Sequence, residues 1–589
     1  MVVLSCTRTR DRVRRQIWWL AVASLAFGLL APRSAHAIFL DKGRNISLRA
    51  FGYTQTTLAT EDSLPETDPV RKAGQVIQQR NFFEPEFEAK LVPLLGIGWL
   101  DDLSVRFAYW GFYDGVYDYG TGQYAERAAD IKFRHTIQVG NQAPYQLGFQ
   151  GKAYHDDAVL QNRDQRNDTR DVYGLRYRVN EAYVNIAKGP VFVRIGRQAI
   201  SWGEADTIGL LDANNPFDST LAPGLQQDLD ESRIPLWTLR ATVQIFDNVG
   251  PFSSGFIDTY WVPGWLDTTI SPAPVSSGSP YSAPQGPASF THVTDVRPEF
   301  STKNSRWGAR FQTVVARDYT LSAWFYTTFP TTPAVRALGI DSQHLITTTT
   351  EHRLTNVIGL SNSFYSDLAN SVVRSELELF NGEPGFVVKD AVLKASNSGF
   401  TQPGSITRAN ILRGELGFDR NFFLQALNPA NSFVWTTSFV FAANLSETKH
   451  TDYRAGGLIK PSAIRRQLDG GPQAGSVTDE CDGEPKQTSP GLHGCDFVNQ
   501  DVFEYFAQTH LQTDFMHGSL TPQVTTIING HGALTWVPEV TYRISDSFIS
   551  DVKWITTHTF GGVNGGFGTG VGLFRDRDQV WFRLTYQIN

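Results

Sequence analysis

The sequence is poor in sulfur and in charge. Its 589 residues include 3 Cys and 2 Met, too few for a disulfide scaffold, an iron–sulfur protein or a methionine-rich site for soft metals. Charged residues make up 19% of the chain, and no run of Lys or Arg follows the first 15 residues. A basic surface for nucleic acid is therefore not expected.

Long apolar runs and enzyme signatures are also missing. Beyond residue 37, no stretch of 18 consecutive apolar residues could form a transmembrane helix. There is no Gly-x-Ser-x-Gly elbow, His-Glu-x-x-His helix or phosphate-binding Gly-x-x-x-x-Gly-Lys loop. We therefore expect no catalytic, cofactor-binding or metal-binding residues, no cofactor and no enzymatic activity.

The first 37 residues predict a cleaved export signal. Several Arg precede an apolar run from Ile17 to Ala31, and the small residues Ala35 and Ala37 fit a peptidase site before Ile38. The apolar run is short for a bilayer-spanning helix, which needs roughly 20 residues. We exclude residues 1–37 from the fold and expect residues 38–589 to form a single domain, because no linker interrupts the strand signals.

Two cysteines remain after removal of the signal, Cys481 and Cys495, in a stretch rich in Gly and Pro. Export makes a disulfide between them the natural expectation. Closing this loop would contribute about 3 kcal/mol in the chain-entropy model. His493 lies nearby, but two Cys and one His fall short of a structural zinc set.

Apolar residues recur with period two along the whole mature chain. At the C-terminus they alternate with polar residues, at positions Val580, Phe582, Leu584, Tyr586 and Ile588. The same spacing appears at 103–109, 237–245, 433–441 and 534–544. Because period two places alternate side chains on opposite faces of a strand, the sequence predicts an all-β protein.

The connections between the expected strands alternate in length. Short turns are expected at 188–189, 247–251, 317–318, 367–370 and 545–547. Long segments are expected near 199–235, 264–303, 330–351, 382–404 and 446–502. Outer-membrane barrels distribute their periplasmic turns and extracellular loops in this way.

We therefore predict a transmembrane up-and-down antiparallel β-barrel in the outer membrane of a Gram-negative bacterium. The strand count is about 20, with 18 as the second choice, because the strands at 131–139, 144–153 and 520–529 are the weakest. A soluble β-sandwich also alternates, but it would bury aliphatic side chains. Here Trp, Tyr and Phe gather near strand ends, as lipid-interface girdles require.

The densest motif lies in the hairpin and loop at 179–218. It reads R-x-G-R-Q-x-x-x-W-G-E from Arg194 to Glu204, and the stretches ESRIPLWTL, TYWVPGW and NSRWGARF follow it. In this order the segments resemble DUF1302, an uncharacterised outer-membrane family with a porin-like barrel. The Gly-Arg-Gln triplet after an alternating strand more weakly resembles alginate-export barrels.

The resemblance to DUF1302 implies transport of hydrophobic compounds such as steroids or terpenoids. It also implies two partners, a periplasmic lipoprotein and an inner-membrane pump of the resistance-nodulation type. It brings no catalytic residues. Outer-membrane lipid and a small-molecule solute are the remaining partners that we expect.

Several charged positions are expected on the lumen side of the wall. In the strand before the motif loop, Val191, Val193 and Ile195 would face lipid, and the other row would face the lumen. The candidate pore-lining or selectivity residues are Arg194, Gln198, Arg374, Glu376 and Arg413. Cross-strand ion pairs that brace the wall are the alternative role for such charges.

The acidic loop at 199–235 is the candidate constriction. Its length is typical of functional loops, and an inward fold would narrow the pore. An outer surface loop held by an Arg–carboxylate pair is the alternative. Arg197 breaks the alternation, which indicates a bulge or the rim of the strand, where its side chain could be re-aimed toward Glu204 or Asp206. The candidate constriction residues are Arg197, Trp202, Glu204, Asp206 and Asp212.

The function expected from these features is passage of a hydrophobic or amphipathic small molecule through the outer membrane. Two alternatives stay open. A polysaccharide or efflux exporter would need a wide lumen lined by Arg, and a structural anchor or adhesin would have a sealed barrel with binding loops.

Overall fold

The structure is a computed structural model. It describes residues 38–63, 71–116, 134–139, 145–148, 152–154, 174–203, 213–218, 229–271, 291–316, 318–331, 334–340, 346–387, 395–396, 399–400, 406–446, 453–454, 502–560 and 570–588. The expected signal at 1–37 and the expected disulfide between Cys481 and Cys495 lie outside these residues.

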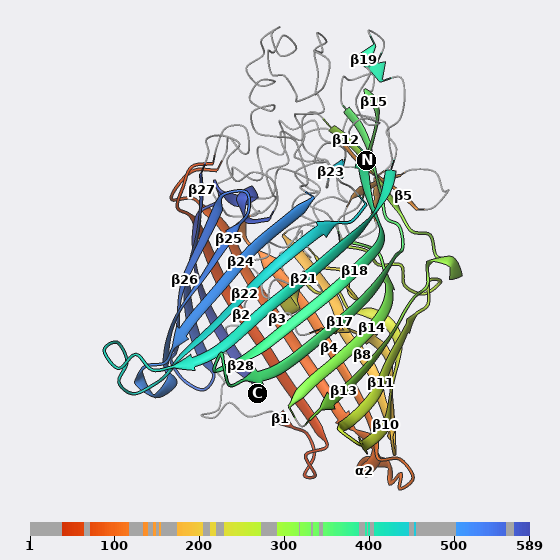
Figure 1. Cartoon of the computed structure of the whole chain (residues 1–589), viewed down its shortest axis with the longest axis vertical. Helices are drawn as coiled ribbons and strands as arrows, with labels where there is room; N and C mark the ends of the chain where they lie inside the picture. Colours follow the sequence, from red (N-terminus) through yellow and green to blue (C-terminus); the bar gives the residue numbers. More distant parts are fainter. Residues whose placement is uncertain are drawn as a thin grey trace, which may run out of the picture.

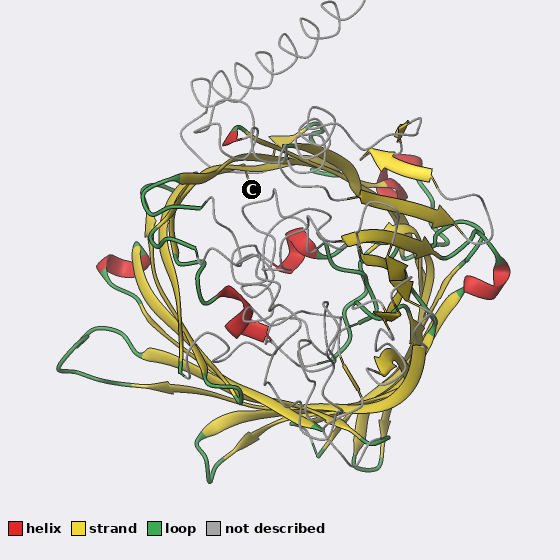
Figure 2. Cartoon of the chain, turned by 90° about the horizontal axis from the view of Figure 1, so that it is seen from above, coloured by secondary structure: helices red, strands yellow, loops and turns green. Residues whose placement is uncertain are grey.

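In the described part of the chain, 18 antiparallel strands form a closed barrel, drawn from the side in Figure 1. Each strand pairs with the next, and the last returns to the first, where residues 579–588 pair with residues 50–59. The ring of strands is seen from above in Figure 2. The strands are β2 (Ile46–Ala59), β3 (Val76–Lys90), β4 (Asp102–Asp114), β8 (Leu175–Lys188), β9 (Val191–Gln198), β10 (Leu236–Val249), β11 (Phe252–Val262), β13 (Arg306–Val315), β14 (Tyr319–Thr328), β17 (Thr355–Ser366), β18 (Ser371–Val387), β21 (Ile406–Phe422), β22 (Phe433–Asn444), β24 (Phe503–Thr513), β25 (Leu520–Asn529), β26 (Ala533–Arg543), β27 (Phe548–Thr559) and β28 (Gln579–Ile588).

The all-β barrel is confirmed, but the first choice of 20 strands is wrong and the second choice of 18 is right. The segments expected at 131–139 and 144–153 contain β5 (Arg134–Val139) and β6 (Tyr145–Gly148), which belong to a separate six-stranded sheet. The third weak segment, at 520–529, is the wall strand β25. An alternating pattern identifies a strand but not the sheet that the strand joins. The sequence therefore predicts two strands too many in the barrel wall.

The remaining elements are small. The separate sheet has the order β15 (Ala334–Ile340), β16 (Ile346–Glu351), β12 (Thr291–Arg297), β5, β6 and β7 (Lys152–Tyr154). Short ladders involve β1 (Ile38–Phe39), β19 (Ala395–Ser396), β20 (Gly399–Phe400) and β23 (Tyr453–Arg454). Helical turns are α2 (Leu91–Leu95), α6 (Leu229–Ser232), η3 (Thr302–Asn304), η6 (Met516–Gly518) and η7 (Gly570–Phe574). No helix among the described residues is both long enough and apolar enough to cross a membrane.

The connections alternate in length as the sequence predicts. At one end of the barrel the wall strands are joined by the short segments 189–190, 250–251, 316–318, 367–370 and 544–547. At the other end they are joined by the long segments 199–235, 263–305, 329–354 and 445–502. One connection at the long-loop end is short, since residues 530–532 alone join β25 to β26.

The two rows of side chains on each strand face different surroundings. On β28, Phe582 and Leu584 are 47% and 42% exposed, whereas Trp581 and Arg583 are 2% and 8% exposed. On β9, Ile195 is exposed and Gln198 is buried. The alternation predicted for both strands is therefore confirmed, with the apolar row outside and the other row inside.

Large apolar side chains cover the outer surface around the ring. Exposed aromatic rings stand near the long-loop ends of strands on both sides of the barrel, at Trp237, Trp261, Trp307 and Trp536. A closed sheet with such a face leaves no unpaired edge and is the form in which strands cross lipid. The protein is an outer-membrane barrel of a Gram-negative bacterium, with its short turns toward the periplasm.

A charge placed on the outer row should destabilise the barrel in lipid. We expect Phe582→Arg to lower the free energy of unfolding by about 2–4 kcal/mol, the cost of a cation on the lipid face near the bilayer midplane. Urea titration of the protein folded into phospholipid vesicles measures this change. The control Phe582→Leu keeps the side chain apolar and should cost far less, so equal losses in both variants would contradict the outward placement.

Candidate functional site

The long connection between β9 and β10 enters the barrel. Its described parts bond to side chains of the inner wall on two sides. The Tyr260 hydroxyl of β11 donates to Asn214 Oδ1 at 2.8 Å, and the Tyr53 hydroxyl of β2 donates to Glu231 Oε2 at 2.9 Å. Loops and short helical turns lie inside the ring of strands in Figure 2. We call the described residues of this connection, 199–203, 213–218 and 229–235, the inserted loop.

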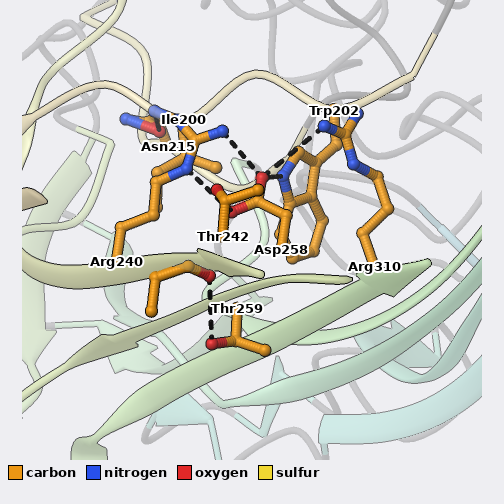
Figure 3. Close-up of polar contacts among 9 residues, drawn as sticks. Ile200, Trp202, Asn215, Arg240, Thr242, Asp258, Thr259 and Arg310 are labelled. Atoms are coloured by element: carbon orange, nitrogen blue, oxygen red, sulfur yellow. Dashed lines mark hydrogen bonds and ion pairs between the residues drawn. The ribbon is translucent and has the colours of Figure 1, made fainter. Parts of the chain in front are cut away.

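One buried carboxylate holds the start of the inserted loop against the wall, as Figure 3 shows. Asp258 of β11 accepts hydrogen bonds from Arg240 Nε at 2.9 Å and Nη2 at 2.7 Å, and from Thr242 Oγ1 at 3.1 Å. The indole Nε1 of Trp202 donates to Asp258 Oδ2 at 2.9 Å. Arg310 Nη2 lies 3.5 Å from the same oxygen.

The surroundings of Asp258 explain how a carboxylate that is only 1% exposed is accommodated inside the barrel. A buried carboxylate is costly unless it is paired and hydrogen-bonded, and this one has both kinds of partner. Its partners come from β10, β13 and the inserted loop. Asp258 therefore connects the loop to three neighbouring strands.

The Trp202 ring fits between aromatic rings of the inner wall. Its centroid lies 5.1 Å from that of Tyr260 and 6.2 Å from that of Tyr326. At Gly308, a Cβ would stand 2.6 Å from the Tyr260 ring and 2.9 Å from the Trp202 ring. Glycine at this position is therefore required by the close approach of the loop to the wall.

The end of the inserted loop is held by arginines of β8. Arg178 Nη2 donates to the backbone oxygens of Glu231 at 3.1 Å and Arg233 at 3.0 Å. Arg176 Nη1 lies 2.5 Å from Asp218 Oδ2, and both side chains are buried. Together with the contacts of Tyr53 on β2 and Tyr260 on β11, these contacts attach the inserted loop to the part of the wall that runs from β2 to β11.

A second group of contacts closes the long-loop end of the β2–β28 seam. Arg71, which is fully buried, donates to the backbone oxygens of Asp576 at 3.2 Å and Asp578 at 2.8 Å. The Ser63 hydroxyl donates to the Asp576 oxygen at 3.0 Å. The first and last loops of the barrel are therefore joined through backbone oxygens.

Glu61 lies in this joint, just beyond the end of β2. Partial burial, together with the neighbouring carboxylates of Asp578 and Asp576, raises the pKa of Glu61 to about 7. A carboxylate beside two others is disfavoured in its charged form. The joint between the two loops therefore carries less repulsion when Glu61 is protonated.

The two expected wall residues of β9 lie on the inner row. Arg194 Nε donates to Asn185 Oδ1 at 2.7 Å, and its guanidinium carbon lies 4.1 Å from the Tyr183 ring centroid. Gln198 is fully buried, and its amide donates to the backbone oxygens of Arg194 and Thr238. Gln198 thus braces the wall, whereas Arg194 is partly exposed.

The other three expected wall residues lie in a different sector, on β18 and β21. Arg374 pairs with Asp419 at 2.8 Å, and Arg413 pairs with Glu383 at 2.7 Å. Glu376 is 4% exposed and lies against Gly203 of the inserted loop, whose added Cβ would stand 2.2 Å from Glu376 Oε2. The structure therefore brings Glu376 to the inserted loop but does not bring these three residues to Arg194.

The expected constriction residues are only partly described. Trp202 is in the inserted loop, whereas Glu204, Asp206 and Asp212 lie outside the described residues. Of the two interpretations of Arg197, a bulge or the rim of the strand, the bulge is wrong, because β9 keeps a continuous register with β10 from Val191 to Gln198. Arg197 is the second-last residue of β9 and so lies at its rim. The continuous alternation leaves Arg197 on the outer row, opposite the exposed Trp237.

Sequence reasoning missed the partners that hold the loop, namely Asp258, Tyr53 and Glu231. An available signal was the strand GFIDTYWV, in which Asp258 falls on the row opposite Ile257 and Trp261. An acid on that row must face the inside of the barrel, where it needs a cationic partner. Among the described residues, no group of three or more His, Cys, Asp or Glu could hold a metal ion.

Comparisons with known proteins give one family match. The model of the family described as "Protein of unknown function (DUF1302)" matches residues 18–588. No curated protein matches the chain. Among solved structures, the chain is similar to OccK9 (OpdG) of Pseudomonas aeruginosa, with 7% identity and a TM-score of 0.41 over 92% of this chain and 98% of that one. It is similar to the same extent to OccAB4 of Acinetobacter baumannii, with 7% identity and a TM-score of 0.41 over 92% and 98% of the two chains.

Removing the charge at the buried carboxylate should loosen the inserted loop. We expect Asp258→Asn to lower the free energy of unfolding by about 3–5 kcal/mol, because it removes a carboxylate that is 1% exposed and takes its counter-charge from Arg240. Urea titration in vesicles measures the loss. The control Asp419→Asn breaks a pair whose acid is 30% exposed and should cost about 1 kcal/mol or less. Similar losses in both variants would show that Asp258 is not the main attachment.

The joint between the first and last loops should weaken as the pH rises. The raised pKa of Glu61 means that its contribution to stability is complete below pH ~4.5 and is lost as the pH rises through about 7. Hydrogen exchange of residues 60–63 and 570–578 should therefore be faster at pH 8 than at pH 5 after correction for intrinsic rates. Glu61→Gln should remove this difference, and a difference that persists in the variant would assign the effect to another group.

Proposed function

The chain belongs to the DUF1302 family, and from this membership and the geometry of its lumen we propose that it is a channel. A hydrophobic or amphipathic small molecule crosses the outer membrane through it without chemical change. The observation that supports this best is the attachment of the inserted loop halfway along the wall. Asp258 is the seventh of 11 residues in β11, and Tyr53 is the eighth of 14 in β2. A loop held at that height narrows the passage instead of capping it.

The character of the inner wall supports an amphipathic solute. Guanidinium groups lie over aromatic rings at several places, with Arg194 over Tyr183 at 4.1 Å and Arg413 over Phe380 at 4.1 Å. Such pairs offer an apolar face beside a charge. Passage of small ions alone would not require these aromatic rings. A solute that carries both a ring system and a polar group can contact the aromatic ring and the guanidinium group together.

The solute class and the protein partners in this proposal rest on the family resemblance: the solute is of the steroid or terpenoid kind, and the channel works beside a periplasmic lipoprotein and an inner-membrane pump. Two further parts rest on the sequence itself: the chain is exported through its signal at 1–37, and Cys481 forms a disulfide with Cys495.

Conductance of the purified protein in planar lipid bilayers tests the channel. We expect an ion current, and we expect deletion of residues 204–230 to raise it, because that deletion removes part of the loop that narrows the lumen. A deletion of similar length in another loop, residues 455–480, is the control and should leave the current near its original value.

Three outcomes separate the candidate functions. Blockage of the current by added steroid or terpenoid supports the proposed solute, and blockage by acidic sugars instead would favour an exporter. Absence of any current in the intact protein and in the deletion would favour a sealed anchor. An unchanged current after deletion of 204–230 would show that the inserted loop is not the constriction.

A further inference from the structure

Two arginines stand directly opposite each other on the inner wall. Arg194 of β9 and Arg240 of β10 are paired residues in the ladder between these strands. Like charges in this position repel, and such pairs destabilise a sheet. The arrangement breaks a local rule of sheet stability, which is typical of a position kept for function.

The positive charge of this sector is only partly neutralised. Arg240 shares the carboxylate of Asp258 with Arg310, at 2.7 Å and 3.5 Å. The hydrogen-bond partner of Arg194 is the neutral amide of Asn185. Among the described residues Arg194 makes no ion pair, so its positive charge is the one in this sector that Asp258 does not neutralise.

Two other arginines of the inner wall are balanced by acids. Arg106 lies 3.1 Å from Glu86 and 2.7 Å from Glu181. On the other side of the inserted loop, Arg374 pairs with Asp419, as described above. The cationic sector of β9 to β13 is therefore flanked by walls in which carboxylates match or outnumber the arginines named here. A mobile anion in the lumen would be drawn to the sector between them.

Aromatic rings lie beside the excess charge. The guanidinium carbon of Arg194 is 4.1 Å from the Tyr183 ring and 5.6 Å from the Phe192 ring. Phe192 and Asp258 both pair with Thr242, so this ring stands on the same rung as the contact with Trp202. The sector therefore adjoins the inserted loop, where a passing solute is closest to the wall.

We propose that this sector binds the carboxylate of an amphipathic organic acid. The inference rests on the proposed channel and names the chemical class of its solute. The planar guanidinium of Arg194 donates parallel hydrogen bonds to the two carboxylate oxygens, and Arg240 adds a second positive charge. The rings of Tyr183 and Phe192 contact the apolar body of the acid.

Equilibrium binding to the full-length protein in detergent tests the sector independently of transport. The probe is 2-naphthoate, and the comparison is 2-naphthalenemethanol, which keeps the ring system without the charge. Isothermal titration should show at least tenfold tighter binding of the naphthoate. Equal affinities for the acid and the alcohol would overturn the proposal.

Three variants locate the binding. Arg194→Gln should weaken naphthoate binding about tenfold and leave binding of the alcohol unchanged. Arg194→Lys should recover part of the affinity, because it restores the charge without the planar pair of donors. Lys553→Gln removes an inner-wall charge that pairs with Glu539 at 2.9 Å in another sector, and it should leave both affinities unchanged.

The outcomes for this site and for the channel are distinguishable. An unchanged affinity in Arg194→Gln, or an equal loss in Lys553→Gln, would refute the site even if the protein conducts ions. Naphthoate binding that depends on Arg194 in a protein without conductance would refute the channel and retain the site. Circular dichroism and the heat-induced shift in gel mobility show whether each variant has folded.

Discussion

The closure of the sheet is the constraint on which the other features of the molecule depend. In hydrocarbon, a backbone N–H or C=O without a partner costs several kcal/mol, so a sheet that crosses lipid must have no free edge. Here β28 returns to β2 over ten paired positions. Once the ring is closed, each strand has one row of side chains in lipid and one row inside, which is why charged residues such as Asp258 and Arg583 are found on the inner row.

On the inner wall, ion pairs and the close packing of an aromatic ring together hold the inserted loop. Asp258 neutralises guanidinium groups of two strands, and the same carboxylate accepts the indole hydrogen of Trp202. Glycine at position 308 leaves the space that the indole ring occupies. The inserted loop is thus held by a charge cluster and by close packing around one indole ring, and the two requirements restrict it to one position.

Much of this fold follows from the sequence, because period two and the lengths of connections are local properties. They identify the rows of β28 and β9 and place the short turns. They do not show that β5 and β6 leave the wall, since pairing partners are set by contacts far apart in the chain. The attachment of the loop was beyond the sequence for the same reason: Tyr53 and Glu231 are 178 positions apart. The sequence left a bulge and the rim of the strand open for Arg197, and the structure has no bulge there, because Arg197 stands at the end of β9 with the register unbroken.

Tyr53 connects the loop to the seam of the barrel. Its hydroxyl bonds to Glu231, and the guanidinium of Arg583, on the last strand, lies 4.2 Å from its ring. Tyr53, which belongs to the first wall strand, therefore contacts both the inserted loop and the last strand. Arg583 lies beside the Tyr53 ring because β28 is paired with β2, so the sealing of the cylinder and the setting of its interior share one aromatic ring.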